Sequence, residues 1–304
     1  MSMVSVFHGI IPPVVTLFDK HGHFDPVSMG KLIDYLIEGG VHGLLFLGSS
    51  GEFSQMTPDD RKRVAEFAVH HVAHRVPVLI GTGSPGTDTS VLLSRHAEAI
   101  GADGVLVVNP FYWQLSEENL FRHYQQISRS VRIPVLLYNF PDLTGQDLSP
   151  DFVLKCADNL ENIAGIKETT DFAGHIREMI LKVKGKHPDF TVFSGFDDHL
   201  FNTLALGGDG GIPATANFAP EIATGLCTAF WKKDYSEAIR LHQKISHLMD
   251  IYQLDSPFVS AVKEAVNLRG LDISTGVLPP AKTLSEDGKK VLTELLLREG
   301  LLDR

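Results

Sequence analysis

Short apolar runs alternate with amphipathic segments along most of the chain. Few polar residues interrupt these runs, which suits strands buried on both faces of a parallel sheet. The runs occupy residues 9–18, 43–48, 76–83, 104–110, 133–140, 163–167, 190–195 and 208–215. The pattern therefore predicts a parallel sheet whose strands are joined by helices.

The segments between the runs have the signals of helix starts. In residues 58–75 and 116–127, apolar side chains recur at spacings of three and four, which predicts helices with one buried face. A capping side chain followed by proline at the first helical position occurs at Asp25-Pro26, Thr57-Pro58 and Ser149-Pro150. We therefore expect each apolar run to be followed by a helix.

About eight strand-then-helix units match a (β/α)₈ TIM barrel, although the alternation alone leaves an open doubly wound sheet possible. After Pro220 no further strand-like run appears, and Ser256-Pro257 predicts the start of one of several helices. We expect residues 1–219 to form the barrel. Residues 220–304 are expected to form its last helix and a C-terminal helical extension, packed on the barrel or on a partner subunit.

Charge and cysteine content narrow the class of protein. The 304-residue chain is 43% hydrophobic with a net charge of −10, which argues against a nucleic-acid ligand. Its two cysteines, Cys156 and Cys227, are too few for a disulfide framework and are expected in the core. No signal peptide or membrane span is recognised. We therefore expect a cytoplasmic protein.

Lys167 stands where the apolar run at 163–167 ends, and such a position in a barrel is where catalysis occurs. A lysine amine among apolar walls loses hydration of its charged form, and its pKa falls from about 10.4 toward roughly 7–8. The neutral amine can attack a carbonyl and form a Schiff base. The alternative is a structural ion pair with Glu168 or Asp171.

Other polar side chains also follow the predicted strands. Backbone N–H groups and hydroxyls in the turn that contains Ser49 and Ser50 can hold a carboxylate, or the serines can cap a helix. Tyr138 is a candidate general acid and base, or a core tyrosine at the barrel rim. Asp197 and Asp198 can accept hydrogen bonds from polyol hydroxyls, or can cap the next helix.

Two further sequence patterns, one typical of dinucleotide binding and one of metal binding, are weaker evidence for a site. The stretch GTGSPG at 81–86 matches a dinucleotide-binding motif, with Asp103 at a suitable spacing, but Pro85 stiffens the loop and the motif does not open a domain. His70, His71 and His74 share a helix, but without an HExxH pattern a metal site is disfavoured. No metal or organic cofactor is expected.

Five motifs in order resemble the dihydrodipicolinate synthase / N-acetylneuraminate lyase family of class I aldolases. The resemblance covers essentially the whole chain, and tyrosine before asparagine-x-proline followed by G-I-K is its most specific part. The motifs are GSSGE (48–52), NPFYW (109–113), YNFPDLTG (138–145), GIKET (165–169) and GGDGGI (207–212).

The resemblance implies a TIM barrel that assembles as a homotetramer, a dimer of dimers. It implies that Lys167 forms the Schiff base with pyruvate or another keto acid and that Tyr138 moves protons. Ser49 would relay protons to Tyr112, which can reach into a neighbouring subunit's site. The substrate-binding residues are then expected to be Gly48, Ser50, Gly195, Asp197, Asp198 and Ile212.

Leu143 differs from the residue that the synthases of this family have at the same position, and the difference narrows the range of possible substrates. The synthases resembled here have an arginine at this position that binds the carboxylate of aspartate semialdehyde, and leucine cannot pair with that charge. The amino-acid sequence of the motifs is most similar to that of the bacterial 2-keto-3-deoxy sugar-acid aldolases. We therefore predict retro-aldol cleavage to pyruvate and a short aldehyde. A synthase, an N-acetylneuraminate lyase and a non-catalytic keto-acid-binding regulator remain alternatives.

Overall fold

The computed structural model describes residues 7–303, and within them the strands form one parallel sheet. Successive strands from β2 to β8 pair with each other in sequence order, and β8 also pairs with β1. The strands are β1 (Gly9–Ile10), β2 (Leu44–Phe46), β3 (Val78–Gly81), β4 (Gly104–Val108), β5 (Val135–Asn139), β6 (Ile163–Glu168), β7 (Thr191–Ser194) and β8 (Gly210–Gly211).

The ring closes between the segment after β1 and strand β2. Pro13 and Leu45 form a parallel bridge. The amide of Val14 donates to the Leu45 carbonyl at 2.8 Å, and the Leu45 amide donates to the Pro12 carbonyl at 3.0 Å. The predicted (β/α)₈ barrel is thus confirmed, and the open sheet is wrong.

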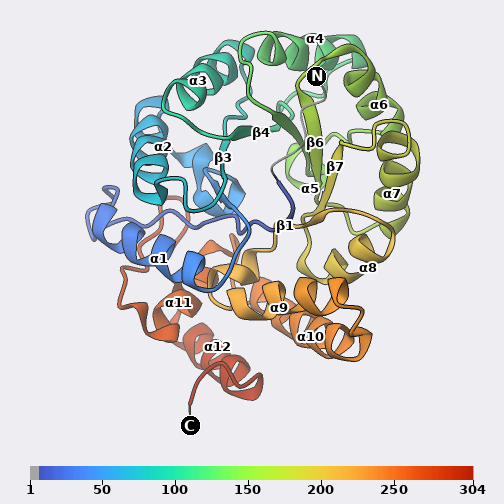
Figure 1. Ribbon diagram of the computed structural model, residues 1–304. Helices are drawn as coiled ribbons and strands as arrows, with labels where there is room; N and C mark the ends of the chain where they lie inside the picture. Colours follow the sequence, from blue (N-terminus) through green and yellow to red (C-terminus); the bar gives the residue numbers. More distant parts are fainter. Residues whose placement is uncertain (1–6, 304) are drawn as a thin grey trace.

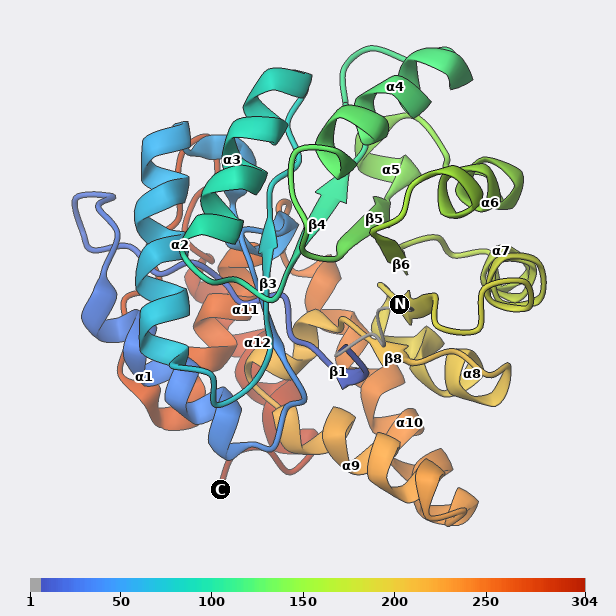
Figure 2. The same cartoon turned by 45° about the horizontal axis from the view of Figure 1, so that its top comes forward.

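Helices surround the strands, as Figures 1 and 2 show. The capping signals are confirmed, because Asp25, Thr57 and Ser149 each accept a hydrogen bond from a first-turn backbone amide. The longer helices of the ring are α1 (Pro26–Glu38), α2 (Pro58–Val72), α3 (Thr87–Ala99), α4 (Glu117–Ser128), α6 (Pro150–Asn159) and α9 (Pro220–Trp231); shorter ones are α5 (Pro141–Thr144), α7 (Ala173–Glu178), continued by Met179–Lys184, and α8 (Leu200–Ala205).

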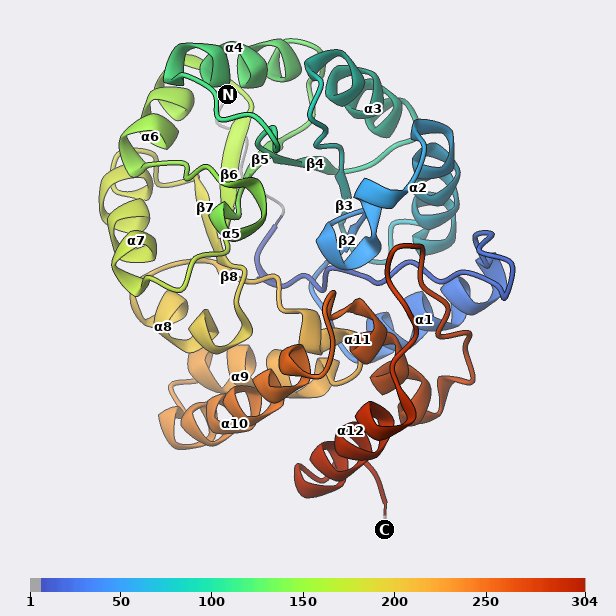
Figure 3. The ribbon, with the colours of Figure 1, turned by 180° about the vertical axis from the view of Figure 1, so that it is seen from behind.

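The chain after α9 is helical, as expected, and lies along one side of the barrel in Figure 1. In Figure 3 the segment between its last two helices runs beside the short helices that follow β2. These elements are α10 (Tyr235–Leu248), α11 (Val259–Val266) and α12 (Glu286–Arg298). No helix within residues 7–303 is long and apolar enough to cross a membrane.

Three sequence predictions need correction. The first strand is shorter than the run at 9–18, because the prolines at 12 and 13 have no amide hydrogen to donate to a ladder. The last strand ends at Gly211, shortly before Pro213. Helix α11 begins at Val259 rather than at Ser256-Pro257.

Side chains of the strands and of the inner helix faces form one continuous apolar core. Cys156 and Cys227 are fully buried in it, as expected, and burial raises the pKa of each thiol to about 12. Both thiols therefore behave as small apolar side chains. Several of the buried polar residues, among them Asn139, Lys167 and Glu168, lie at the carboxyl ends of the strands, where the candidate site lies.

Candidate active site

Lys167 lies in β6 opposite Tyr138 of β5, and its residue is only 4% exposed. Its Nζ donates a hydrogen bond to the Tyr138 hydroxyl at 3.4 Å and lies 4.4 Å from the centre of the Tyr138 ring. The register of two neighbouring parallel strands is what brings this amine and this phenol together.

No carboxylate among the described residues lies within ion-pair distance, 4.0 Å, of the Lys167 amine. The two acidic residues considered as partners face other groups. Glu168 lies beside His175, and Asp171 lies 3.4 Å from His199. The structural ion pair predicted as an alternative is therefore wrong, and the amine faces only a phenol.

The Tyr138 hydroxyl continues the contact to Ser49, whose Oγ lies 3.2 Å away. Ser49 begins a short 3₁₀ turn, and its side chain caps no helix. Tyr138 therefore has two side-chain partners, and the three residues form an unbroken chain of hydrogen bonds. Either oxygen of the Ser49–Tyr138 pair can be the donor, so protons can pass in both directions.

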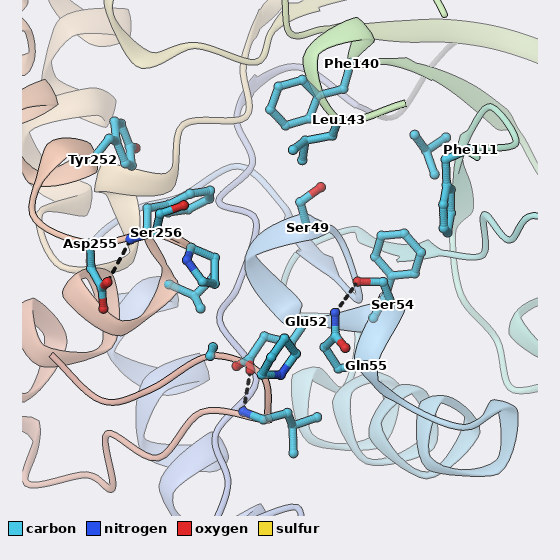
Figure 4. A pocket seen from close by; sticks show the side chains of 18 of the residues that line it. Ser49, Glu52, Ser54, Gln55, Phe111, Phe140, Leu143, Tyr252, Asp255 and Ser256 are labelled. Carbon is cyan, nitrogen blue, oxygen red and sulfur yellow. Dashed lines mark hydrogen bonds between the residues drawn. The ribbon is translucent and has the colours of Figure 1, made fainter. Parts of the chain in front are cut away.

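Ser49 opens onto a cavity of about 710 Å³ at the mouth of the barrel. Phe111, Phe140 and Leu143 supply much of its apolar wall, and Figure 4 shows Tyr252, Asp255 and Ser256 on a facing side. No arginine or lysine lines the cavity within the described part of the chain. A small molecule in the cavity can therefore pass Ser49 and approach Tyr138 and Lys167. The cavity wall offers no cation to hold a second carboxylate of that molecule.

The other predicted site residues differ in exposure. Ser50 is 3% exposed and Ile212 is fully buried, whereas Tyr112 is 93% exposed and has a φ of 87°. Gly48 precedes the short turn that begins at Ser49. Gly48 and Ser50 thus follow the carboxyl end of β2 and Ile212 follows that of β8, while Tyr112 is exposed to solvent in the single chain.

Gly195 follows β7, and a side chain there would collide with the neighbouring strand end. A Cβ at this position would lie 1.8 Å from the Thr169 hydroxyl and 2.9 Å from the Glu168 carbonyl. The Thr169 hydroxyl is itself buried and has no hydrogen-bond partner in the described residues. Thr169, which sequence reasoning did not single out, belongs to the same layer of the site as Lys167.

Asp197 does not cap a helix, since Phe196 precedes the turn at 197–199 and no side chain caps it. One Asp197 carboxylate oxygen accepts from the Thr215 amide at 2.8 Å and the other accepts from the Tyr252 hydroxyl at 2.9 Å. Burial raises the pKa of this carboxyl, and these bonds oppose the shift. Asp197 therefore anchors Tyr252 at the cavity wall. The helix after Asp198 likewise has no side-chain cap.

A buried ion pair supports the same wall, and sequence reasoning missed it. Lys263 in α11 is fully buried, and its Nζ lies 2.5 Å from the Glu52 carboxylate and 2.7 Å from the Gly276 carbonyl. The second Glu52 oxygen accepts from the Leu278 amide at 2.7 Å. The pair joins the loop after β2 to the C-terminal helices.

A second missed cluster lies directly beyond Tyr138 and Lys167. His175 at the start of α7 lies between Glu168 and Asp147, at 3.0 Å and 3.2 Å. The Asn139 amide donates to the same two carboxylates, at 2.7 Å to Asp147 and 3.2 Å to Glu168. Only the carboxylate next to Lys167 could have suggested this cluster from the sequence.

The weaker sequence patterns have structural explanations. The turn at 81–86 receives the buried Arg61 guanidinium, which donates to the Gly81 and Gly83 carbonyls at 2.9 Å and 3.0 Å. His71 contacts Asp34 at 3.1 Å. No group of three or more His, Cys, Asp or Glu side chains among residues 7–303 is arranged so that it could hold a metal ion.

Comparison with known proteins agrees with this geometry. The model of the dihydrodipicolinate synthetase family matches residues 6–298. The chain is 52% identical over 296 residues to YagE of Escherichia coli K12, which is provisionally named a 2-dehydro-3-deoxy-D-gluconate aldolase, and the match covers 97% of this chain and 98% of YagE. It is 51% identical over 296 residues to YjhH of the same organism, provisionally named a 2-dehydro-3-deoxy-D-pentonate aldolase, with 97% and 98% covered.

Solved structures of such proteins also superpose closely on this chain. A crystal structure of YagE in complex with pyruvate superposes with a TM-score of 0.97, covering 98% of this chain and 100% of that one. The dihydrodipicolinate synthase of Thermotoga maritima, at 32% identity, superposes with a TM-score of 0.93, covering 98% and 100%.

Proposed function

This chain belongs to the dihydrodipicolinate synthetase family, and we propose that it is a class I aldolase that cleaves 2-keto-3-deoxy sugar acids to pyruvate and a short aldehyde. The observation that carries the proposal is the buried Lys167 amine, which faces the Tyr138 phenol and no carboxylate. YagE and YjhH, named for two such reactions, support the choice of substrate class.

The reaction follows from the chemistry of the hydrogen-bonded chain. The Lys167 amine attacks C2 of the keto acid, and loss of water gives an iminium. The iminium accepts the electron pair of the C3–C4 bond as that bond breaks, while Tyr138 takes the proton of the C4 hydroxyl and the aldehyde leaves. The remaining enamine is protonated at C3 and hydrolysed, which releases pyruvate and regenerates the amine.

Ser49, Ser50 and Gly48 have supporting roles in this proposal. Ser49 passes protons to and from Tyr138, and the turn from Gly48 to Ser50 holds the keto-acid carboxylate with its amides and hydroxyls. Gly195 leaves room above the strand end, and the backbone carbonyl of Ile212 faces the reacting carbon. Asp198 contributes hydrogen-bond acceptors for the polyol tail.

The aldehyde end of the substrate is neutral in this proposal, because Leu143 supplies no charge to the cavity. A carboxylate placed against Leu143 would lose hydration without gaining a partner. The synthase reaction with aspartate semialdehyde is therefore disfavoured. A cytoplasmic location and a homotetramer are also part of the proposal. The tetramer is supported by the 93% exposure of Tyr112 and the 73% exposure of Trp113, which a neighbouring subunit would cover.

The test is mass spectrometry after borohydride reduction in the presence of pyruvate. We expect a stable adduct on Lys167 of the wild-type protein and none on Lys167→Ala. The absence of an adduct at saturating pyruvate would reject the aldolase mechanism. Turnover of 2-keto-3-deoxygluconate, N-acetylneuraminate, and pyruvate with aspartate semialdehyde then separates the three substrate classes, and light scattering tests the tetramer.

A further inference from the structure

The residues that follow Tyr138 and Lys167 enter one buried charged cluster. Asn139 and Glu168 are paired in register at the ends of β5 and β6. The Asn139 side-chain amide lies 3.2 Å from the Glu168 carboxylate. Successive residues of a strand point to opposite faces, so the two reactive side chains point into the barrel while their successors lie behind them. Any shift of the cluster therefore moves the reactive pair.

Glu168 depends on this cluster for its charge. Its residue is fully buried, and its Oε1 atom has no hydrogen-bond partner among the described residues. Burial raises the pKa of the Glu168 carboxyl, and the contacts with His175 oppose that rise. Without a nearby cation, a carboxylate in this position would be driven to take up a proton.

His175 supplies the cation. Burial alone would lower the pKa of its imidazole, but the carboxylates of Asp147 and Glu168 outweigh burial and raise the pKa to about 10. The bond from His175 also lowers the pKa of Asp147, against the effect of burial. At neutral pH His175 is therefore an imidazolium, held between the Asp147 and Glu168 side chains at 3.2 Å and 3.0 Å.

The cluster also fixes the backbone at the two strand ends. The Asn139 carbonyl accepts from the Thr169 amide at 2.9 Å, and the Asn139 side-chain oxygen accepts from the Leu148 amide at 3.0 Å. His175 and Asp147 thus tie the start of α7 and the loop before α6 to the strand residues directly after the reactive pair.

We propose that His175 is a positioning residue, whose imidazolium joins Asp147 to Glu168 and thereby sets the separation of the Lys167 amine and the Tyr138 phenol. The inference rests on the proposed function, since it gives that separation a catalytic purpose. Misplacement of reacting groups by about 1 Å can cost about 10²-fold in rate. The contact at 3.4 Å is already at the long end of a hydrogen bond and has little room to lengthen.

The experiment compares His175→Gln with His175→Arg and with a matched control. Lys184→Gln removes a partly buried ion pair with Asp209, at 2.8 Å, at the opposite end of the barrel, where β7 and β8 begin. The readouts are kcat and KM for cleavage, the rate of borohydride-trapped pyruvate adduct on Lys167, and thermal unfolding.

We expect His175→Gln to lower kcat and the trapping rate by about 10²-fold, with KM changed by less than about threefold. His175→Arg keeps a cation able to bridge two carboxylates and should recover kcat to within about tenfold of wild type. Lys184→Gln should lose stability but keep the kcat of the wild-type protein.

The outcomes separate the two proposals. Failure of the wild-type protein to form an adduct rejects the proposed function. A wild-type protein that forms the adduct, together with a folded His175→Gln variant that has unchanged kcat and trapping rate, overturns the positioning role alone. A kcat loss of equal size in Lys184→Gln would also overturn it, because both losses would then follow from stability. If His175→Gln does not fold, Asp147→Asn tests the positioning role of His175 instead, and we expect its kcat to fall by about tenfold. An unchanged kcat in Asp147→Asn overturns that role.

Discussion

Two lysines are buried within residues 7–303, and their surroundings give them opposite roles. Lys167, at the end of β6, has a phenol at 3.4 Å and no carboxylate within ion-pair distance in the described chain. Lys263, in α11, has the Glu52 carboxylate at 2.5 Å and the Gly276 carbonyl at 2.7 Å. The first amine is left able to react, whereas the second is held by its partners.

The physical difference is in how each charge is compensated. Burial lowers the pKa of Lys263, and the charge of Glu52 opposes the shift and favours the ammonium. A buried ion pair of this kind adds little net stability over apolar side chains, but removing one partner is costly. Lys167 has no such partner, so its loss should affect chemistry rather than folding.

The largest expected effect is loss of catalysis in Lys167→Met. Methionine is similar in length and apolar, so the buried site keeps its packing and no charge is left unpaired. Turnover should fall by about 10³-fold or more because the covalent step is gone. Steady-state assays check turnover, and urea unfolding should give wild-type stability or slightly more. Marked destabilisation would show that Lys167 has a structural partner after all.

Lys263→Met should have the reverse effect. The Glu52 carboxylate would remain buried without its cation, which destabilises the protein by about 3–5 kcal/mol. Urea unfolding measures this loss, while the trapped pyruvate adduct should still form on Lys167 below the transition. The double variant Lys263→Met, Glu52→Leu serves as the control and should recover much of the stability. A loss of less than about 1 kcal/mol of unfolding free energy in Lys263→Met would contradict the structural role of the Lys263–Glu52 pair.

Glu52→Gln makes Lys263 resemble Lys167 by removing its carboxylate. We expect a loss of about 2 kcal/mol, less than for Lys263→Met, because the glutamine oxygen still accepts a hydrogen bond and the lysine can lose its proton. Peptide mapping after borohydride treatment should still find pyruvate on Lys167 alone. An adduct on Lys263 would mean that burial without a carboxylate is enough, and that the phenol is not required.

The last test concerns His175, a third cation, which is paired with carboxylates as Lys263 is. Its pKa is raised from 6.5 to about 10, so the native state holds this proton more tightly than the unfolded chain does. Its contribution to stability is therefore full below about pH 6.5, declines as the pH rises, and is lost above about pH 10. Urea unfolding across this range should show a decline in the wild-type protein that is weaker in His175→Arg. An equal pH dependence of the unfolding free energy in the wild-type protein and in His175→Arg would contradict the raised pKa of His175.

The fold could be predicted because its signals are local. Each apolar run became a buried strand, and proline after a capping side chain marked three helix starts correctly. The runs at 9–18 and 208–215 overestimated their strands most, because the prolines that follow Gly9–Ile10 and Gly210–Gly211 have no amide hydrogen to donate to a ladder. The helix start at Ser256-Pro257 was wrong because Asp255 instead closes a turn, accepting from the Ser256 amide at 2.8 Å and the Ser260 hydroxyl at 2.6 Å.

The candidate site was only partly predictable. Lys167, Tyr138 and Ser49 could be selected because each ends a strand or begins the turn after one. Asp197 has the same kind of position, yet its carboxylate is engaged by Thr215 and Tyr252. His175 gave no signal, because its two carboxylate partners come from other elements.

By itself, the sequence determined the alternation of strand and helix, the burial of the strands, and a lysine at a strand end. It selected Lys167, which ends a strand-like run, but gave no sign that Lys263, which also stands between an apolar residue and a glutamate, is buried and paired with Glu52. Only the tertiary structure showed how each buried amine is compensated. Packing of α11 against the loop after β2 brought Lys263 to Glu52 across 211 residues, and pairing of β5 with β6 brought Tyr138 to Lys167 across 29. Compensation of a buried charge depends on neighbours in space, and local sequence does not specify those neighbours.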